Sequence, residues 1–145
     1  MTRLVDALAA YARFYETLSP ATLPGIAALL APNARFKDPF NDVRGADRIV
    51  RLLATMYEHG TPRFEVIDQA VSERAGYLLW RYTSDPGGGR APWVIDGMTE
   101  LRFDADGRVL EHVDHWDAAG QFYEKLPVVG WLIRRIKRRL QLREG

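Results

Sequence analysis

Apolar residues in the N-terminal part of the chain recur with the spacing of helices. Five of them follow one another at steps of four, three, four and three: Leu4, Leu8, Tyr11, Tyr15 and Leu18. This stripe predicts an amphipathic helix with Thr2 as its N-cap. We expect a second, short helix over residues 22–31, closed by Pro32, and then a brief strand over residues 34–38. A third helix is predicted over residues 45–60.

The period then changes to two, which is typical of strands. Four such segments are rich in β-branched and aromatic residues: residues 63–71, 76–84, 92–103 and 108–117. Turn residues separate them, with DPGGGR at 85–90 and DADG at 104–107. Helices with one short strand, followed by an antiparallel meander, predict the α+β class.

The C-terminal segment, residues 127–145, predicts one more amphipathic helix. Its apolar side chains fall on one helical face: Val129, Leu132, Ile133, Ile136 and Leu140. Cations crowd the remaining face: Arg134, Arg135, Lys137, Arg138 and Arg139. We therefore predict two parts, an α+β domain over residues 1–126 and a basic amphipathic helix over residues 127–145.

The net charge of +1 hides an uneven distribution. Residues 127–145 hold six of the 20 Lys and Arg and one of the 19 acidic residues, which leaves 14 basic and 18 acidic residues, a net charge of −4, for residues 1–126. A mildly acidic body argues against a domain that binds nucleic acid over its whole surface. Two interpretations of the basic helix stay open: contact with an anionic membrane surface, or docking on the body or on a partner subunit.

Composition excludes several kinds of chemistry. The chain has no cysteine, so disulfides, thiolate metal sites and cysteine nucleophiles are excluded, and a cytoplasmic location is expected. No secretory signal is visible, and the longest nearly apolar run, residues 126–133, is far shorter than the roughly 17–25 residues of a membrane span. Histidine spacing gives no metal site and no glycine-rich loop precedes a helix, so we expect no metal and no cofactor.

Four segments together resemble a known group of proteins. They are ARFYE at residues 12–16, FKDPF at 36–40, GADRI at 45–49, and LRFDADGR at 101–108 followed by Trp116. In this order the chain resembles the nuclear transport factor 2-like superfamily, in the branch of SnoaL-like polyketide cyclases and ketosteroid isomerases. The resemblance implies a cystatin-like cone, in which a curved antiparallel sheet is wrapped by three N-terminal helices around an apolar pocket. The same scaffold hosts enzymes and non-enzymatic binders.

The resemblance to the isomerases implies roles for individual residues. Asp38 matches the base that removes a proton next to a substrate carbonyl. Phe14 stands where those enzymes have a tyrosine donor, with Tyr15 beside it, and Thr99 stands where they have a protonated aspartate. The base is therefore retained, whereas the two donors to the enolate oxygen are replaced.

The last predicted strand carries the most informative pattern. Alternation places His112, Asp114 and Trp116 on one face. Trp116 matches a pocket-lining tryptophan of the isomerases, which implies that His112 and Asp114 also face the cavity. An acid and an imidazole on a rigid strand suit proton transfer. SnoaL-like cyclases use such an acid for an intramolecular aldol closure, and the resemblance makes Asp114 the candidate for that role.

These residues allow two functions. One is a cofactor-free enzyme of isomerase, cyclase or hydrolase type acting on a small hydrophobic carbonyl compound, with Asp38, Asp114, His112 and Tyr15 as the catalytic set. The other is a ligand-binding module or homodimeric assembly module, in which Asp38 orders a turn and Asp114 pairs with a cation such as Arg81. Further residues are predicted to line the pocket: Phe14, Tyr11, Phe40, Met56, Trp80, Thr99 and Trp116. Which face of strand 76–84 lines it stays open.

Overall fold

The computed structural model describes residues 2–144. These residues form two compact units, the first ending at His115 and the second beginning at Trp116. The predicted boundary at residue 126 falls inside the second unit. We describe each unit by itself.

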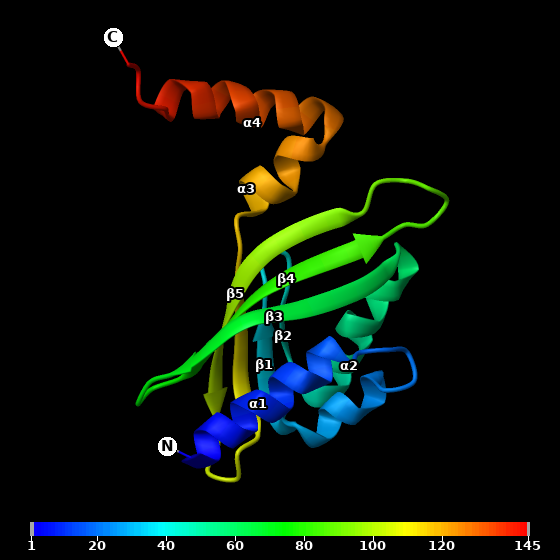
Figure 1. Cartoon of the computed structure of the whole chain (residues 1–145), viewed down its shortest axis with the longest axis vertical. Helices are drawn as coiled ribbons and strands as arrows, with labels where there is room; N and C mark the ends of the chain where they lie inside the picture. The colour runs from blue at the N-terminus through cyan, green and yellow to red at the C-terminus, as the bar shows by residue number, and fades with distance from the viewer. Residues whose placement is uncertain (1, 145) are drawn as a thin grey trace. The chain divides into compact units, whose positions relative to one another are not determined.

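The first unit is built on a six-stranded sheet with the strand order β2-β1-β6-β5-β4-β3. β1 and β6 run parallel, and all other neighbours are antiparallel. Figure 1 shows β3, β4 and β5 as long, bent ribbons with α1 lying across them. The predicted α+β class and curved sheet are confirmed. The strands are β1 (Leu30–Lys37), β2 (Asp42–Arg44), β3 (Thr61–Val71), β4 (Gly76–Asp85), β5 (Trp93–Phe103) and β6 (Val109–His115).

Helices cover one face of this sheet. The predicted first and third helices are present as α1 (Thr2–Glu16) and α2 (Ala46–Ala54), the latter continued by the 3-10 turn η2 (Thr55–Glu58). α1 packs against β3 and β4, and α2 packs against β1. Their apolar side chains form the core with the inner face of the sheet. The largest fully buried side chains are Tyr11, Leu8, Ile26, Ile49, Leu101 and Val109.

The second predicted helix, over residues 22–31, is wrong in type and extent. The chain forms a short 3-10 helix instead, η1 (Leu23–Ala28), and enters β1 at Leu30. Pro32 therefore lies inside a strand and does not close a helix. It is tolerated because the pairing of β1 with β6 is irregular between Leu30 and Arg35, where the missing N–H of a proline costs no ladder bond.

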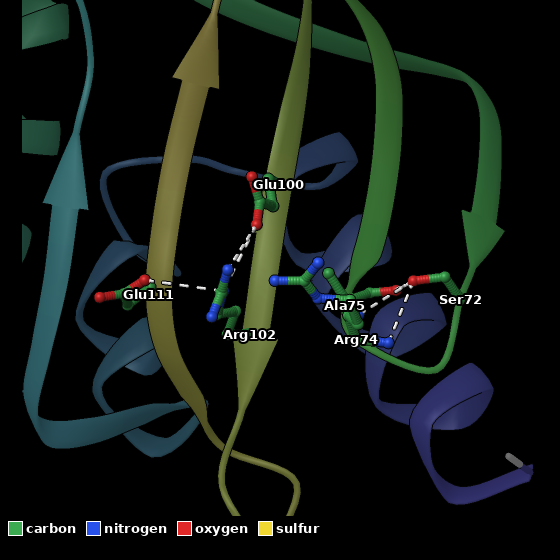
Figure 2. A network of polar contacts seen from close by, with 6 residues as sticks. All are labelled: Ser72, Arg74, Ala75, Glu100, Arg102 and Glu111. Carbon is green, nitrogen blue, oxygen red and sulfur yellow. Dashed lines mark hydrogen bonds and ion pairs between the residues drawn. The ribbon is translucent and has the colours of Figure 1, made fainter.

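Charged side chains cover part of the outer face of the sheet. Figure 2 shows Arg102 of β5 between Glu100 and Glu111, at 3.4 Å and 3.9 Å. Arg81 of β4 pairs with Asp96 of β5 at 2.8 Å, a partner different from the Asp114 that the sequence suggested. The inner, apolar face is thus distinguished from a partly charged outer face, as alternation requires.

The second unit consists of short helices only: α3 (Ala118–Gln121), the 3-10 turn η3 (Tyr123–Lys125) and α4 (Pro127–Leu140). β6 ends at His115, so the predicted strand over residues 108–117 is too long at its end. The carboxylate of Asp117 caps α3 by accepting a hydrogen bond from the Gly120 amide at 2.9 Å, which starts a helix where the strand was expected to continue. Among residues 2–144, no helix is long and apolar enough to cross a membrane.

Candidate functional site

A small cavity lies between α1 and the inner face of the sheet in the first unit. Its volume is about 20 Å³, which is enough for one water-sized group, since a water molecule needs about 10–15 Å³. The walls combine four polar and four apolar or aromatic side chains: Tyr15, Thr99, His112 and Asp114 with Phe64, Val66, Leu78 and Trp80.

The sheet places the polar residues at the cavity by its register. His112 and Asp114 are two residues apart on β6 and therefore share its inner face. Asp114 lies opposite Thr99 in the antiparallel pair of β5 and β6. Thr99 and His112, with 2% and 4% of their surfaces exposed, are the buried polar side chains of residues 2–144 other than tyrosines. Buried polar groups need partners.

The first set of partners begins at an indole. The Trp80 Nε1–H can only donate, and it donates to the Thr99 hydroxyl at 2.7 Å. Thr99 therefore gives its own proton to Asp114, with 2.5 Å between Oγ1 and Oδ1. Because the donor of each of these two hydrogen bonds is fixed, Oδ1 of Asp114 is held in one position beside the cavity.

His112 completes the coordination of the same carboxylate oxygen. Its Nε2 lies 2.8 Å from Asp114 Oδ1, and its Nδ1 lies 2.9 Å from the Tyr11 hydroxyl. In the tautomer in which Nε2 donates to the carboxylate of Asp114, Nδ1 accepts from Tyr11. The imidazole is also stacked on Phe36, with ring centroids 4.3 Å apart. Both nitrogens and one ring face of His112 are thus engaged.

Two tyrosines of α1 extend the network. The Tyr11 and Tyr15 hydroxyls are 3.4 Å apart, a weak contact for two oxygen atoms. Burial raises the pKa of Tyr11, and it raises the pKa of Tyr15 well above its ordinary value. Both phenols are therefore neutral at physiological pH. Since Tyr11 gives its proton to His112, Tyr15 is the phenol whose proton can turn to a bound molecule.

The structure brings together several of the residues predicted for the site. Tyr15, His112 and Asp114 of the predicted catalytic set line the cavity, as do Trp80 and Thr99 of the predicted pocket set. Trp80 also answers the question of which face of β4 turns inward. Tyr11 lies behind the cavity wall, where it supports His112.

Asp38 is not among the residues that line the cavity, and it orders a turn. Its Oδ1 accepts hydrogen bonds from the backbone amides of Phe40 at 2.8 Å and Asn41 at 2.7 Å. The Asn41 side-chain amide adds contacts at 3.2 Å and 3.3 Å. This is the turn-forming role that the sequence left open as the alternative to a base.

The other predicted pocket residues are also not among those that line the cavity. Phe14 is half-buried and packs edge-on against Tyr15, with ring centroids 5.8 Å apart, so Tyr15 occupies the position at the cavity. Phe40 is exposed beyond β1, and Met56 lies in η2. Trp116 follows the end of β6 and belongs to the second unit.

Three wall residues were missed by the sequence analysis: Phe64, Val66 and Leu78. They belong to β3 and β4, and the register places Phe64 opposite Tyr82 and Val66 opposite Trp80. Alternation along residues 63–71 already groups Phe64 with Val66. A period of two shows which residues share a face but not which face is inward. The register with the neighbouring strand was needed to decide that.

Known proteins with the same fold support the description above. A bent sheet whose inner face and covering helix enclose a small cavity defines the class of nuclear transport factor 2-like proteins. Within that class the chain belongs to the SnoaL-like domain family, whose model matches residues 11–112. No curated protein sequence matches the chain. Among residues 2–144, no group of three His, Cys, Asp or Glu side chains is arranged to hold a metal ion.

Solved structures share the fold at low sequence identity. A nuclear transport factor 2-like protein of unknown function from Burkholderia pseudomallei K96243 is 20% identical, with a TM-score of 0.69 over 83% of this chain and 95% of that one. A protein proposed to be a SnoaL-like polyketide cyclase, from Jannaschia sp. CCS1, is 17% identical, with a TM-score of 0.67 and coverages of 82% and 88%. A protein with a ketosteroid isomerase-like fold from Catenulispora acidiphila DSM 44928, in complex with trimethylamine, is 13% identical, with a TM-score of 0.67 and coverages of 79% and 88%.

Proposed function

We propose that this protein binds the carbonyl group of a small hydrophobic molecule and moves a proton on it, without a cofactor, with Asp114 as the base. One observation carries the proposal. Asp114 lines the cavity while two donors, Thr99 and His112, fix its Oδ1. No residue among those described donates a hydrogen bond to Oδ2, so that oxygen is available to a bound molecule.

The chemistry follows from these positions. Oδ2 of Asp114 takes a proton from the carbon next to the carbonyl, and the C–H electron pair moves into a carbon–carbon double bond while the carbonyl oxygen becomes negative. The neutral Tyr15 phenol donates a hydrogen bond to that oxygen. Where the substrate has a carbon–carbon double bond conjugated with this enolate, Asp114 returns the proton to the far carbon of that bond, the carbonyl re-forms and the double bond has moved, which is isomerisation. Alternatively, the enolate carbon attacks a second carbonyl, which closes a ring, and Asp114 protonates the new alkoxide.

His112 acts as a positioning residue in this scheme. Its Nε2–H holds Oδ1 of Asp114, and its ring is itself held by Tyr11 and Phe36. When one oxygen of a carboxylate is held by hydrogen bonds, the other oxygen points in one direction. The carboxylate then has less orientational freedom left to lose on the way to the transition state.

The size of the cavity limits the substrate. A space of about 20 Å³ receives one small group, and its walls are largely apolar. A larger molecule therefore enters with its carbonyl end only, or Phe64 and Val66 of the edge strand β3 move to admit it. Small ketones and aldehydes with one acidic C–H are the compounds to test first.

The experiment measures exchange of C–H protons for deuterium in such ketones by NMR in D₂O. The native chain is expected to accelerate exchange next to the carbonyl, and Asp114→Asn is expected to lower the rate by about 10²-fold or more. Asp96→Asn is the matched control, because it makes the same chemical change on the outer face, where Asp96 pairs with Arg81. Equal rates for the two variants would exclude Asp114 as the base.

The second candidate is a non-catalytic ligand-binding or homodimeric assembly module. The small volume of the cavity favours it, because a space of about 20 Å³ holds little substrate. The exposed pair of Leu79 and Met98 on the outer face of the sheet also favours it, because apolar side chains there suit contact with a second copy of the chain. In this case the native chain binds ketones, as seen by NMR shifts of His112, with no exchange above the buffer rate.

A further inference from the structure

α4 carries an exposed apolar stripe. Its members follow at steps of three, four and four residues, the spacing of one helical face, and 42%, 50%, 47% and 82% of their surfaces are exposed: Val129, Leu132, Ile136 and Leu140. Soluble monomers rarely expose a contiguous apolar surface of this kind unless it serves an interaction.

Within the second unit, Glu124 contacts α4 on a side different from the apolar stripe. Arg134 donates to the Glu124 carbonyl oxygen at 2.9 Å, and Lys137 donates to the Glu124 carboxylate at 2.9 Å. Gly130, the one buried residue of α4, lies against the same carbonyl group. At about 100° per residue these three contacts are centred roughly 120° around the helix from the centre of the apolar stripe. η3 therefore fixes the face from which the stripe projects.

Cations border the stripe on one side. At about 100° per residue, Arg135 and Arg139 lie at its Leu132 edge, and both are exposed. Arg138 and Trp131 project from the opposite side of the helix, where the Trp131 ring lies 5.6 Å from the Arg135 guanidinium. Residues 127–145 contain six Lys and Arg against one Glu.

We propose that α4 binds the surface of an anionic lipid bilayer and lies in its plane. The apolar stripe enters the boundary of headgroups and acyl chains, while Arg135 and Arg139 at its edge contact lipid phosphates. A helix of 14 residues is about 21 Å long, shorter than the roughly 30 Å of a hydrocarbon core, so it lies on the bilayer without crossing it. An anionic bilayer matches both features at once, because it offers apolar depth and a dense layer of negative charge side by side.

The test is flotation of the whole chain with vesicles of phosphatidylcholine alone and of phosphatidylcholine mixed with phosphatidylglycerol. We expect binding to the mixed vesicles, little binding to the neutral ones, and weaker binding as salt is raised. Arg135→Gln with Arg139→Gln is expected to lower the partition coefficient about 25-fold, at about fivefold per cation. Leu132→Asp with Ile136→Asp is expected to abolish binding.

The matched control is Arg51→Gln with Arg63→Gln, which removes two exposed cations from the first unit and should leave flotation unchanged. Circular dichroism checks that each variant stays folded. Equal binding to neutral and mixed vesicles, no binding by the native chain, or unchanged binding of the Leu132→Asp with Ile136→Asp variant would each overturn the proposal. A shift of that variant from dimer to monomer, with no vesicle binding by the native chain, would assign the stripe to a second copy instead.

Discussion

At the scale of single residues, the site depends on hydrogen bonds that have a direction. Trp80 donates to Thr99, Thr99 donates to Asp114, and on the other side Tyr11 supports His112. Each donor has one proton to give in this arrangement, so the state of one residue sets the state of the next.

This network predicts unequal effects for the two tyrosines of α1. Tyr11→Phe removes the partner of a buried His112 nitrogen and is expected to lower the free energy of unfolding by about 1–3 kcal/mol. Tyr15→Phe should lower it less, because its contact with Tyr11 is 3.4 Å long. Chemical denaturation of both variants measures the difference, and a larger loss for Tyr15→Phe would show that the direction assigned to these bonds is wrong.

A second residue-scale prediction concerns acid stability at the hairpin between β5 and β6. Backbone N–H groups, first that of Arg108, hold the pKa of the Asp104 carboxyl below its ordinary value of 3.8. A lowered pKa in the folded state means stability that is present above about pH 4 and is lost as pH falls through the folded-state pKa. Unfolding midpoints of native chain and Asp104→Asn should therefore differ near neutral pH and converge in acid.

The control for this prediction is Asp106→Asn at the same turn. Asp106 is largely exposed and contacts Arg108 at 3.4 Å only. Its substitution should change the midpoint less than Asp104→Asn at neutral pH. A difference between native chain and Asp104→Asn that persists unchanged in acid would contradict the assignment to Asp104.

How far the sequence predicted the site depends on the kind of signal. A period of two sufficed to place His112 and Asp114 on one face, because strand geometry alone decides it. It failed at Trp116, because a helix cap at Asp117 ends the strand first. Whether Phe14 or Tyr15 lines the cavity depends on how α1 is rotated about its axis relative to the sheet. That rotation is set by packing between distant segments, so no local sequence pattern predicts it.

At the scale of elements, β6 decides where the site lies. It runs between β5 and β1, so both of its edges are paired and its inner-face side chains lie in the interior of the sheet. The antiparallel meander from β3 to β6 was predictable, because short turns join consecutive strands. The parallel pair of β1 and β6 was not, because it joins segments more than 70 residues apart, with no turn to mark the register. The helix expected over residues 22–31 failed for a related reason, since pairing with β6 draws Leu30 into a strand.

The packing of α4 on η3 gives an element-scale prediction. A Cβ at Gly130 would overlap sterically with the carbonyl group of Glu124. Gly130→Ala should therefore separate α4 from η3, and an isolated helix of this length is marginal in water. Helical content by circular dichroism should fall, although alanine favours a helix by about 0.8–1.0 kcal/mol over glycine.

The direction of that change makes the experiment decisive. If contact with η3 did not support α4, helical content would rise with alanine. Val128→Ala is the control, because Val128 is 80% exposed and its replacement removes no contact with η3.

At the scale of the whole molecule, the two faces of the first unit's sheet differ in composition. The inner face builds the cavity, whereas the outer face presents Leu79 and Met98 opposite each other on β4 and β5, 38% and 46% exposed. The Arg81–Asp96 pair lies next along the same two strands. An apolar centre with a charged border is the usual composition of a surface that binds a second protein.

A homodimer through this face leads to a prediction that separates assembly from folding. Leu79→Lys with Met98→Glu puts opposite charges across the same strand pair, so the sheet keeps a favourable cross-strand contact while its apolar centre is lost. Light scattering should show a dimer for the native chain and a monomer for this variant, with similar unfolding midpoints. Val128→Lys with Leu142→Glu makes a similar change at exposed positions of the second unit and should leave the dimer intact. A native chain that is monomeric, or a Leu79→Lys with Met98→Glu variant that still dimerises, would show that this face of the sheet has another use.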